Sequence, residues 1–274
     1  MRVPAICLLI FFYLGWASPA AGDEVVELQA AQVDPAALAV IFSGGERMHY
    51  AVSWSGGVKI GDIYLDIQKD EGGREGAFAI TAKVKDYGPL RAFYPVDDRF
   101  VCFVSGPMKL PDRYEVLQKE GFGKKTTRLI RYDQAQRVVW YKKNKEDELR
   151  FEVAGTLYNE FSAFVISRAL AFRLGESIVV PTFAEQKRHE VEVALVKRTN
   201  RKSIFGNKPV MMIQPRMQFQ GLYEKSGNTT LWLTDDRCRV PVEIHSKITI
   251  GALVAELVEY ANPACPELVK AASR

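Results

Sequence analysis

Short runs of alternating apolar and polar residues, separated by turn-forming residues, fill most of the sequence after residue 46. In the run ERMHYAVSW, the side chains of Met48, Tyr50 and Val52 fall on one face of an extended strand, and His49 falls on the other. About a dozen such runs, rich in Val, Ile, Tyr, Phe and Thr, follow at roughly 8–12-residue spacing. This spacing predicts a mainly β fold: a single large antiparallel meander that forms a barrel or a half-barrel.

A segment of about residues 157–173 departs from this alternation. Its apolar residues lie three and four positions apart, which is the period of a helix with one apolar face: Phe161, Phe164, Val165 and Phe172. Thr156 or Asn159 can cap its first turn, and Gly175 lies where a helix commonly ends. We therefore expect one amphipathic helix that lies across the sheet or plugs one end of it.

The first 22 residues have the organisation of a secretory signal peptide. Arg2 gives a positive start, Ala5–Trp16 is a compact apolar core, and small residues follow, so cleavage is expected among Ala20, Ala21 and Gly22. A membrane anchor is the alternative, but the apolar core is well short of the ~20 residues that span a bilayer. No later segment of the sequence is long and apolar enough to span one. We expect export to the periplasm of a Gram-negative bacterium and a mature protein without a transmembrane span.

The remaining sequence divides into three parts. Residues 23–45 are rich in alanine and are expected to be loosely attached, with a short helix at Pro35 to Ile41. Residues 46–262 show no internal repeat, no low-complexity tract and no linker, so we expect a single β-rich domain. Residues 263–274 form a C-terminal tail.

The charge of the chain is small and evenly distributed. Lys and Arg total 37 and Asp and Glu total 33, which gives a formal net charge of +4 with the two signs interspersed. A nucleic-acid-binding protein usually carries a one-sided basic face, so nucleic acid is not an expected partner. A weak preference for anionic surfaces is compatible with this charge.

Signal cleavage would remove Cys7 and leave Cys102, Cys238 and Cys265. An oxidising compartment favours a disulfide, and an odd number of cysteines leaves at least one thiol free or paired between chains. We favour a Cys238–Cys265 bond, because it would tie down an otherwise loose C-terminus. Cys102 lies in the apolar run RFVCFV and is expected to be a small buried residue.

The sequence offers few residues for catalysis. It contains no metal-binding histidine motif, no nucleophile motif, no phosphate-binding loop and no dinucleotide-binding loop. We therefore predict no catalytic residues, no metal site and no cofactor, and a protein that is not an enzyme. A hydrolase acting on glycan or lipid is a weaker alternative, which requires at least two of six side chains to meet in one cleft. The six are His49, His189, His245, Asp98, Asp235 and Asp236.

The stretch from Leu231 to Gly251 contains three of these six residues, but its pattern is that of a hairpin. Asp235 and Asp236 fall where the chain must turn, which is a common position for acidic residues. Pro241 marks the start of the next strand, where a missing N–H donor is tolerated. His245 is out of phase with the apolar residues of that strand and should point away from their face.

Five aromatic residues spread over the predicted strands are candidates for lining an interior cavity: Tyr50, Trp54, Tyr64, Trp140 and Trp232. If side chains do not fill the interior of the sheet, these residues would bind an apolar ligand there. A plain packed core is the stronger alternative. The periodicity of the strands does not distinguish a filled barrel from a hollow one.

Four stretches of sequence, in a fixed order, carry a family resemblance. They are GERMHYAVSWSGGVKIGD at the start of the meander, NEFSAFVISRAL in the helix, LGESIVVPTFAEQKRHEVEV after it, and LWLTDDRCRVPVEIHSKITIGALVAEL near the end. Together they resemble the domain-of-unknown-function 3108 (DUF3108) family, from about Glu46 to Tyr260. The resemblance implies an exported bacterial envelope protein with a mostly antiparallel, β-barrel-like fold. It implies no activity and no catalytic residues, and Cys238 and Cys265 are not part of its pattern.

These observations favour a non-enzymatic exported protein that binds an apolar or amphipathic envelope component, such as a lipid or a lipid-linked molecule. The alternative is a scaffold of envelope assembly that meets an envelope protein partner through an exposed edge strand or an apolar patch. A fully packed barrel without an opening would argue against a carrier that encloses its ligand.

Overall fold

The computed structural model describes residues 25–73, 75–86, 91, 95–217, 229–247 and 251–271. The signal peptide predicted at residues 1–22 lies outside this range. The described residues include the helices α1 (Pro35–Ile41) and α3 (Glu160–Ser167), a 3-10 turn at Ala30–Gln32, and one 15-stranded sheet. Its strands are β1 (Glu46–Trp54), β2 (Val58–Lys69), β3 (Phe78–Asp86), β4 (Asp97–Ser105), β5 (Leu110–Glu120), β6 (Lys124–Asp133), β7 (Val138–Lys143), β8 (Leu149–Glu152), β9 (Tyr158–Asn159), β10 (Ser177–Ala184), β11 (Lys187–Ser203), β12 (Gly206–Met217), β13 (Thr229–Thr234), β14 (Pro241–Lys247) and β15 (Ala252–Ala261).

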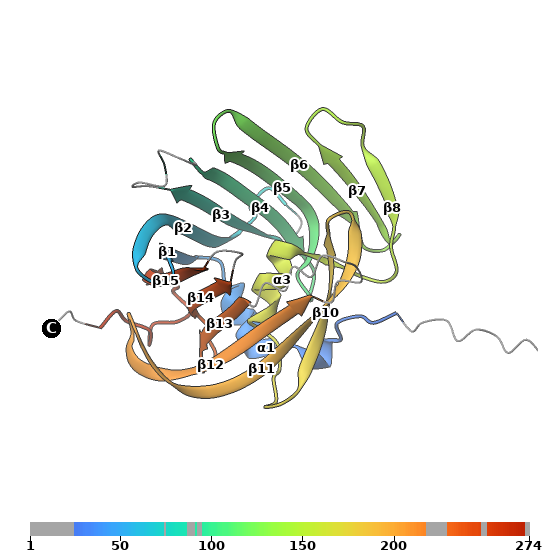
Figure 1. The fold of residues 1–274 in the computed structure, drawn as a ribbon. Helices are drawn as coiled ribbons and strands as arrows, with labels where there is room; N and C mark the ends of the chain where they lie inside the picture. Colours follow the sequence, from blue (N-terminus) through green and yellow to red (C-terminus); the bar gives the residue numbers. More distant parts are fainter. Residues whose placement is uncertain are drawn as a thin grey trace, which may run out of the picture.

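The sheet is a long meander that stays open. Its strand order is β8-β7-β6-β5-β4-β3-β2-β1-β15-β14-β13-β12-β11-β10-β9, so β1 and β15 join the two halves of the chain. The pairs are antiparallel except for the short parallel pair of β9 with β10. β8 and β9 stand at opposite ends of this order, and the sheet curves around the helices without closing (Figure 1). The predicted mainly β, antiparallel fold is confirmed, and its sheet is not closed.

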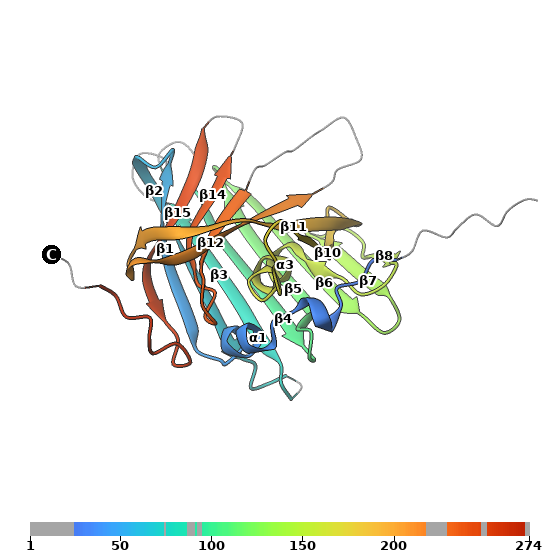
Figure 2. The same cartoon turned by 90° about the horizontal axis from the view of Figure 1, so that it is seen from below.

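The concave side of the sheet is filled. Helices α1 and α3 lie inside the curve of the sheet (Figure 1, Figure 2). α1 buries Val40 and Ile41 there, and α3 buries Val165 and Ile166. These side chains belong to one continuous cluster that also contains the inward-facing residues of the strands. Within the described residues the interior is therefore a packed core, and not the hollow barrel that the sequence left open.

The segment before the first strand is part of this core, so the prediction that residues 23–45 are loosely attached is wrong for the described residues. Val33 is buried, and α1 occupies Pro35–Ile41 as predicted. The Asp34 carboxylate accepts hydrogen bonds from backbone N–H groups of the first turn of α1. Alanine-rich composition suggested a loose segment, but a small side chain such as that of Ala37, which is 0 % exposed, also allows a helix to pack closely.

The helix α3 is shorter than the predicted helix of about 157–173. Asn159 caps it as expected, because its side-chain oxygen accepts from two N–H groups of the first turn. The helix ends at Ser167, since residues 169–171 form backbone hydrogen bonds with residues 32–34 of the N-terminal segment. A backbone group that bonds across to another segment does not continue a helix. The prediction failed because this partner lies far away in the sequence.

The C-terminal tail is held against the body of the protein. Cys238 and Cys265, the pair favoured from the sequence, form a disulfide. Arg237 forms an ion pair with Glu267 at 3.0 Å. The backbone N–H of Ala271 donates to a carbonyl in the turn between β11 and β12. The described part of the tail is therefore attached at three points.

The stretch from Leu231 onward forms the predicted hairpin. β13 ends at Thr234 and β14 begins at Pro241. Asp236 shapes the turn, because its Oδ1 accepts from the Thr234 hydroxyl and from two following backbone N–H groups. His245 is exposed, as its phase predicted.

Candidate functional site

Tyr50 is the predicted interior aromatic that lies in the core. Its side chain is 1 % exposed, and its hydroxyl donates to the Pro241 carbonyl at 2.9 Å. Burial raises the pKa of this hydroxyl far above its usual range. Trp54 pairs with Leu253 of β15 and falls on the inward-facing side of that strand pair. It lies at the end of β1, however, and is 38 % exposed. Tyr50 therefore links two strands within the packed core, and Trp54 lies at its margin.

Tyr64, Trp140 and Trp232 lie on the outer face of the sheet, so the prediction that they line the interior is wrong, although Trp232 is buried there at 8 % exposure and belongs to the apolar cluster. Each of them alternates with inward-facing neighbours. For Tyr64 these neighbours are Ile63 and Leu65, which pack against the core. The alternation of the strand, and not the aromatic character of the residue, decides which side a side chain takes.

Basic side chains and a histidine cover these outer aromatics. Tyr64 stacks on His49 with ring centroids 4.4 Å apart. Trp232 lies under Lys197 and Arg201, whose charged groups are 5.0 and 4.7 Å from its ring. The attraction between a cation and the face of a ring stabilises an aromatic side chain on a polar surface, so these residues need no ligand to explain their position.

The six residues of the hydrolase hypothesis have different surroundings. His49 bonds Asp62, His189 bonds the Ala184 carbonyl, His245 is exposed on β14, Asp98 accepts from the Lys119 N–H, Asp235 pairs with Arg198, and Asp236 shapes its own turn. The structure thus gives five of these residues five different sets of partners, and it leaves the sixth, His245, exposed. An acid and a base that work together must both reach one reacting group.

Residues from three of the four family-like stretches meet at one buried ion pair. Arg168 donates from Nη1 and Nη2 to the two carboxylate oxygens of Glu46, at 2.8 and 2.7 Å. Both side chains are 0 % exposed. Arg168 Nε also donates to the Arg239 carbonyl at 3.0 Å, and the Tyr260 hydroxyl donates to Glu46 at 3.3 Å. The start of β1, the end of α3 and the closing hairpin are joined at this point.

This ion pair serves the fold. Burial alone would lower the pKa of the Arg168 guanidinium, but the Glu46 carboxylate outweighs burial and the pKa is raised. The guanidinium therefore keeps its charge away from solvent. Sequence reasoning did not find it, because the two residues are 122 positions apart and neither lies in a local motif that indicates its partner.

Cys102 is a free and buried cysteine. Its Sγ accepts from Asn159 Nδ2 at 3.1 Å. Burial raises the pKa of its thiol to about 12. Because the thiolate is the reactive form, this thiol is neither charged nor accessible at neutral pH.

We expect a thiol reagent to label no cysteine in the native mature chain and to label Cys102 once the chain is denatured without reductant. Cys238 and Cys265 are protected by their disulfide. Mass spectrometry of the labelled protein checks this expectation. Rapid labelling of Cys102 in the native state would contradict its buried position.

An open groove of about 480 Å³ runs over the outer face of β4–β7. We call it the outer groove. Its apolar floor consists of Val101, Leu117 and Leu129. They alternate with core residues such as Cys102 and Val116 and therefore point away from the core. In Figure 1 the helices lie on the opposite, concave side of these strands.

Three exposed cations rim the outer groove: Arg99, Lys125 and Lys142. We call them the rim cations. None of the ion pairs formed between described residues includes a rim cation. The carboxylate among the lining residues, Glu115, is paired with Arg113 at 3.0 Å. The outer groove therefore presents positive charge beside an apolar surface.

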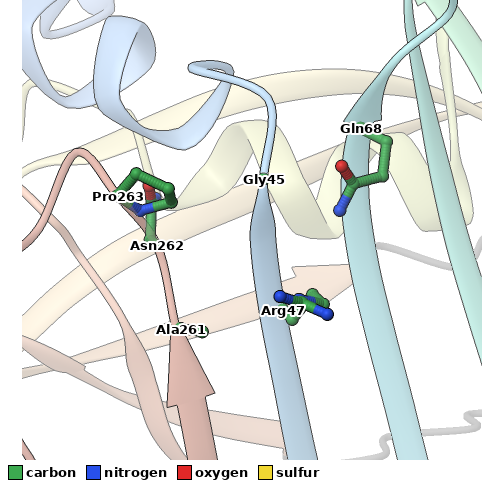
Figure 3. A pocket seen from close by; sticks show the side chains of 6 residues that line it. All are labelled: Gly45, Arg47, Gln68, Ala261, Asn262 and Pro263. Atoms are coloured by element: carbon green, nitrogen blue, oxygen red, sulfur yellow. The ribbon is translucent and has the colours of Figure 1, made fainter.

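A second open hollow, of about 630 Å³, lies at the start of β1 and the ends of β2 and β15 (Figure 3). Arg47 and Gln68 come from β1 and β2, and Asn262 lies across from them. The Asn262 side chain accepts from the Ser43 hydroxyl and donates to the Val40 carbonyl, so the fold uses its polar atoms. Arg47 and Gln68 remain for a ligand, which makes this hollow a weaker candidate than the outer groove.

The part of the chain that the structure describes has neither a metal-binding cluster nor a membrane-spanning helix. It holds no group of three or more His, Cys, Asp or Glu residues placed to bind a metal ion. No helix in it has the length and apolar character needed to cross a membrane.

Comparisons with known proteins show what the chain is similar to. A β-barrel-like protein of the domain of unknown function DUF1849 from Brucella abortus has a similar fold, with a TM-score of 0.55 and 10% identity over 80% of this chain and 98% of that chain. The hypothetical protein CT021 from Chlamydia trachomatis gives a TM-score of 0.32 and 10% identity over 84% of this chain and 93% of that chain, a likeness too weak to carry an argument. A comparison with curated proteins gives no match.

The sequence also matches the family described as "Protein of unknown function (DUF3108)" over residues 49–258. This range covers most of the chain and contains the helix, the closing hairpin and Arg168 of the buried ion pair. The resemblance noted in the sequence is thereby confirmed, and the chain belongs to the DUF3108 family of proteins of unknown function.

Proposed function

We propose that this protein is an exported, non-catalytic binder of an anionic amphiphile, such as a lipid or a lipid-linked molecule of the bacterial envelope, and that the ligand lies in the outer groove. One observation carries the proposal: an open groove combines an apolar floor with three rim cations that pair with no carboxylate of the described residues. The packed interior favours such an external site over a carrier that encloses its ligand.

The two parts of the outer groove suit the two parts of an amphiphile. Its apolar floor would be covered by an acyl segment, and burial of apolar surface contributes about 25 cal/mol per Å². The rim cations would pair with a phosphate or carboxylate through charge-assisted hydrogen bonds. A purely apolar ligand would leave the cations unpaired, and a purely polar anion would leave the floor exposed to water.

Export is part of the proposal. Residues 1–22 have the organisation of a signal peptide. The Cys238–Cys265 disulfide suits an oxidising compartment such as the periplasm. In that compartment the outer groove would be close to the envelope lipids.

Binding without catalysis is proposed because five of the six candidate acid–base residues have different partners and the sixth, His245, is exposed. None of the six lines the outer groove. The groove can hold a ligand by charge and apolar contact, and the carboxylate that lines it, Glu115, is paired with Arg113.

A scaffold that pairs its sheet edges with a protein partner has less support. The edge strand β8 has four residues and β9 has two. An ion pair between Arg150 and Glu152 lies along β8. Short, charged edge strands are a means by which proteins avoid further strand pairing.

A titration with a monomeric anionic lipid tests the proposal. We expect the mature chain to bind dihexanoyl phosphatidylglycerol more tightly than dihexanoyl phosphatidylcholine, which has the same chains and no net charge. Replacing all three rim cations by glutamine should weaken binding of the anionic lipid by about 10- to 100-fold, because each exposed charge pair contributes about 0.5–1 kcal/mol. Isothermal titration calorimetry measures the dissociation constants.

The matched control removes the same charge elsewhere. Lys202, Lys208 and Lys247 are exposed and lie outside the outer groove, so their triple glutamine variant should bind as the parent protein does. Equal weakening in both triple variants would mean that net charge, and not the groove, attracts the lipid. Equal affinity of the parent protein for the two lipids would refute the proposal. In a pulldown from the bacterial envelope with this protein as bait, a partner protein that stays bound through detergent washes would favour the scaffold.

A further inference from the structure

The concave face of the sheet changes from apolar to polar along the strands. The register of β4–β7 orders the inward-facing side chains in rows that cross the sheet. One row is apolar and 0–8 % exposed: Cys102, Tyr114, Ile130 and Tyr141. The next row contains Arg128 opposite Lys143, and the one after it contains Gln118 opposite Thr126. The concave face therefore ends in polar side chains.

These polar side chains line a hollow of about 660 Å³, which we call the mouth pocket. Gln118, Thr126 and Arg128 form its floor on β5 and β6. The turn between β10 and β11, with Glu185 and Gln186, forms the facing wall. The volume lies within the range of about 300–1,000 Å³ that is usual for small-molecule sites.

A chain of polar contacts fixes the groups along one wall of the mouth pocket. Gln118 Nε2 donates to Glu120 Oε1 at 3.2 Å, and Gln118 Oε1 accepts from Arg128 Nη2 at 3.3 Å. Arg128 Nη1 lies 3.5 Å from Oε1 of Glu160, the first residue of α3. Each planar group is oriented by its neighbour, so donors and acceptors alternate in fixed positions along the wall.

The composition of the mouth pocket selects the class of ligand. Two cations, Arg128 and Lys143, are balanced by two lining carboxylates, Glu120 and Glu185. An anion would meet the carboxylates, and a cation would meet Arg128 and Lys143. An apolar ligand would remove water from polar groups without replacing its hydrogen bonds, which is costly.

We propose that the mouth pocket binds a neutral, hydroxyl-rich ligand of the saccharide class. A hydroxyl group is both a donor and an acceptor, so it can continue a wall in which carboxylate, amide and guanidinium groups alternate. Planar side chains such as Gln118 and Arg128 can bond two neighbouring hydroxyls at once. The ligand would lie between the floor of β5 and β6 and the β10–β11 turn.

The mouth pocket and the outer groove share one lining residue, Arg128, and otherwise have different linings. Thr126 lines the mouth pocket, and Thr127, the next residue of β6, lines the outer groove on the other side of the sheet. Binding of a saccharide therefore does not rest on binding of an amphiphile. This pair of threonines also gives a matched set of variants.

Three uncharged trisaccharides serve as probes of the mature chain: maltotriose, cellotriose and triacetylchitotriose. We expect saturation-transfer NMR to detect at least one of them, with a dissociation constant of about 1 mM or tighter by calorimetry. The double variant Gln118→Met and Thr126→Val keeps the shape of the pocket but removes an amide and a hydroxyl. It should bind that trisaccharide about tenfold or more weakly.

The control variant, Gln68→Met with Thr127→Val, makes the same two changes outside the mouth pocket and should bind the trisaccharide as the parent does. Circular dichroism confirms that each variant is folded, and Lys143→Gln replaces the double variant if that one unfolds. The absence of saturation transfer from all three probes at about 10 mM would overturn the proposal. Equal affinities of the mouth-pocket and control variants would overturn it as well. Titration of the Gln118→Met and Thr126→Val variant with phosphatidylglycerol should give the parent's affinity, because neither residue lines the outer groove.

Discussion

Replacing Arg168 by methionine is expected to lower the free energy of unfolding by about 3–5 kcal/mol. The substitution leaves the Glu46 carboxylate in a position where it is 0 % exposed and has lost two hydrogen bonds from the guanidinium. A buried charge without its partner is strongly unfavourable. The Tyr260 hydroxyl still donates to Glu46, but it carries no charge to balance the carboxylate. Urea unfolding at neutral pH, followed by circular dichroism, measures the loss.

A matched control separates this effect from the loss of any arginine. Arg131 also donates to both oxygens of a carboxylate, that of Glu148, but on the surface of the sheet. Arg131→Met should therefore cost at most about 1 kcal/mol. Adding Glu46→Gln to Arg168→Met removes the unpaired charge and should restore part of the loss. Equal losses for the two single methionine variants would show that burial of the Glu46–Arg168 pair has no special effect.

The alternation of side chains within single strands was enough to predict the fold class. In β1 the residues Met48, Tyr50 and Val52 are buried and alternate with more exposed residues, as the sequence indicates. The turn between Thr234 and Pro241 was also visible, since acidic residues and a proline mark its limits. These features depend on neighbours along the chain, and their physical causes are local.

The outer positions of Tyr64, Trp140 and Trp232 could also have been found in the sequence. Each of them lies between two residues that face the core, for example Trp232 between Leu231 and Leu233. Aromatic character was given more weight than strand phase, and this choice caused the error. A basic side chain can cover a ring on the outer face, so an aromatic residue in a strand need not lie inside.

Other features required the three-dimensional fold. The end of α3 depends on pairing with residues 32–34, and the buried ion pair joins positions 122 residues apart. The outer groove depends on register, because Leu117 lies opposite Arg99 and Leu129 lies opposite Lys142 only once the strands are paired. The local pattern of each strand is compatible with many registers, so neither proposed site could be assembled from the sequence.

Substituting Cys238 and Cys265 together by alanine is expected to lower the free energy of unfolding by about 3–4 kcal/mol. The two cysteines are 27 residues apart, and a cross-link that closes a loop of this length restricts the unfolded chain by about that amount. Cys102→Ala is the control, because it removes a buried cysteine that is not in a disulfide. A wild-type urea midpoint that does not change when reductant is added would contradict the expected stabilisation.

The disulfide could also stabilise the folded protein directly. Combining the double alanine variant of Cys238 and Cys265 with Arg168→Met distinguishes this effect from an effect on the unfolded chain. The Cys238 and Arg239 carbonyls accept from Arg168 at 3.4 and 3.0 Å, so the bond could act by holding this turn against the guanidinium. In that case the two losses would overlap, because each variant would remove the same contact. We expect the losses to add within about 0.5 kcal/mol, since Asp236 holds the turn through three hydrogen bonds of its own. Additive losses of unfolding free energy would indicate that the disulfide acts by restricting the unfolded chain, in which the contacts of Arg168 are absent.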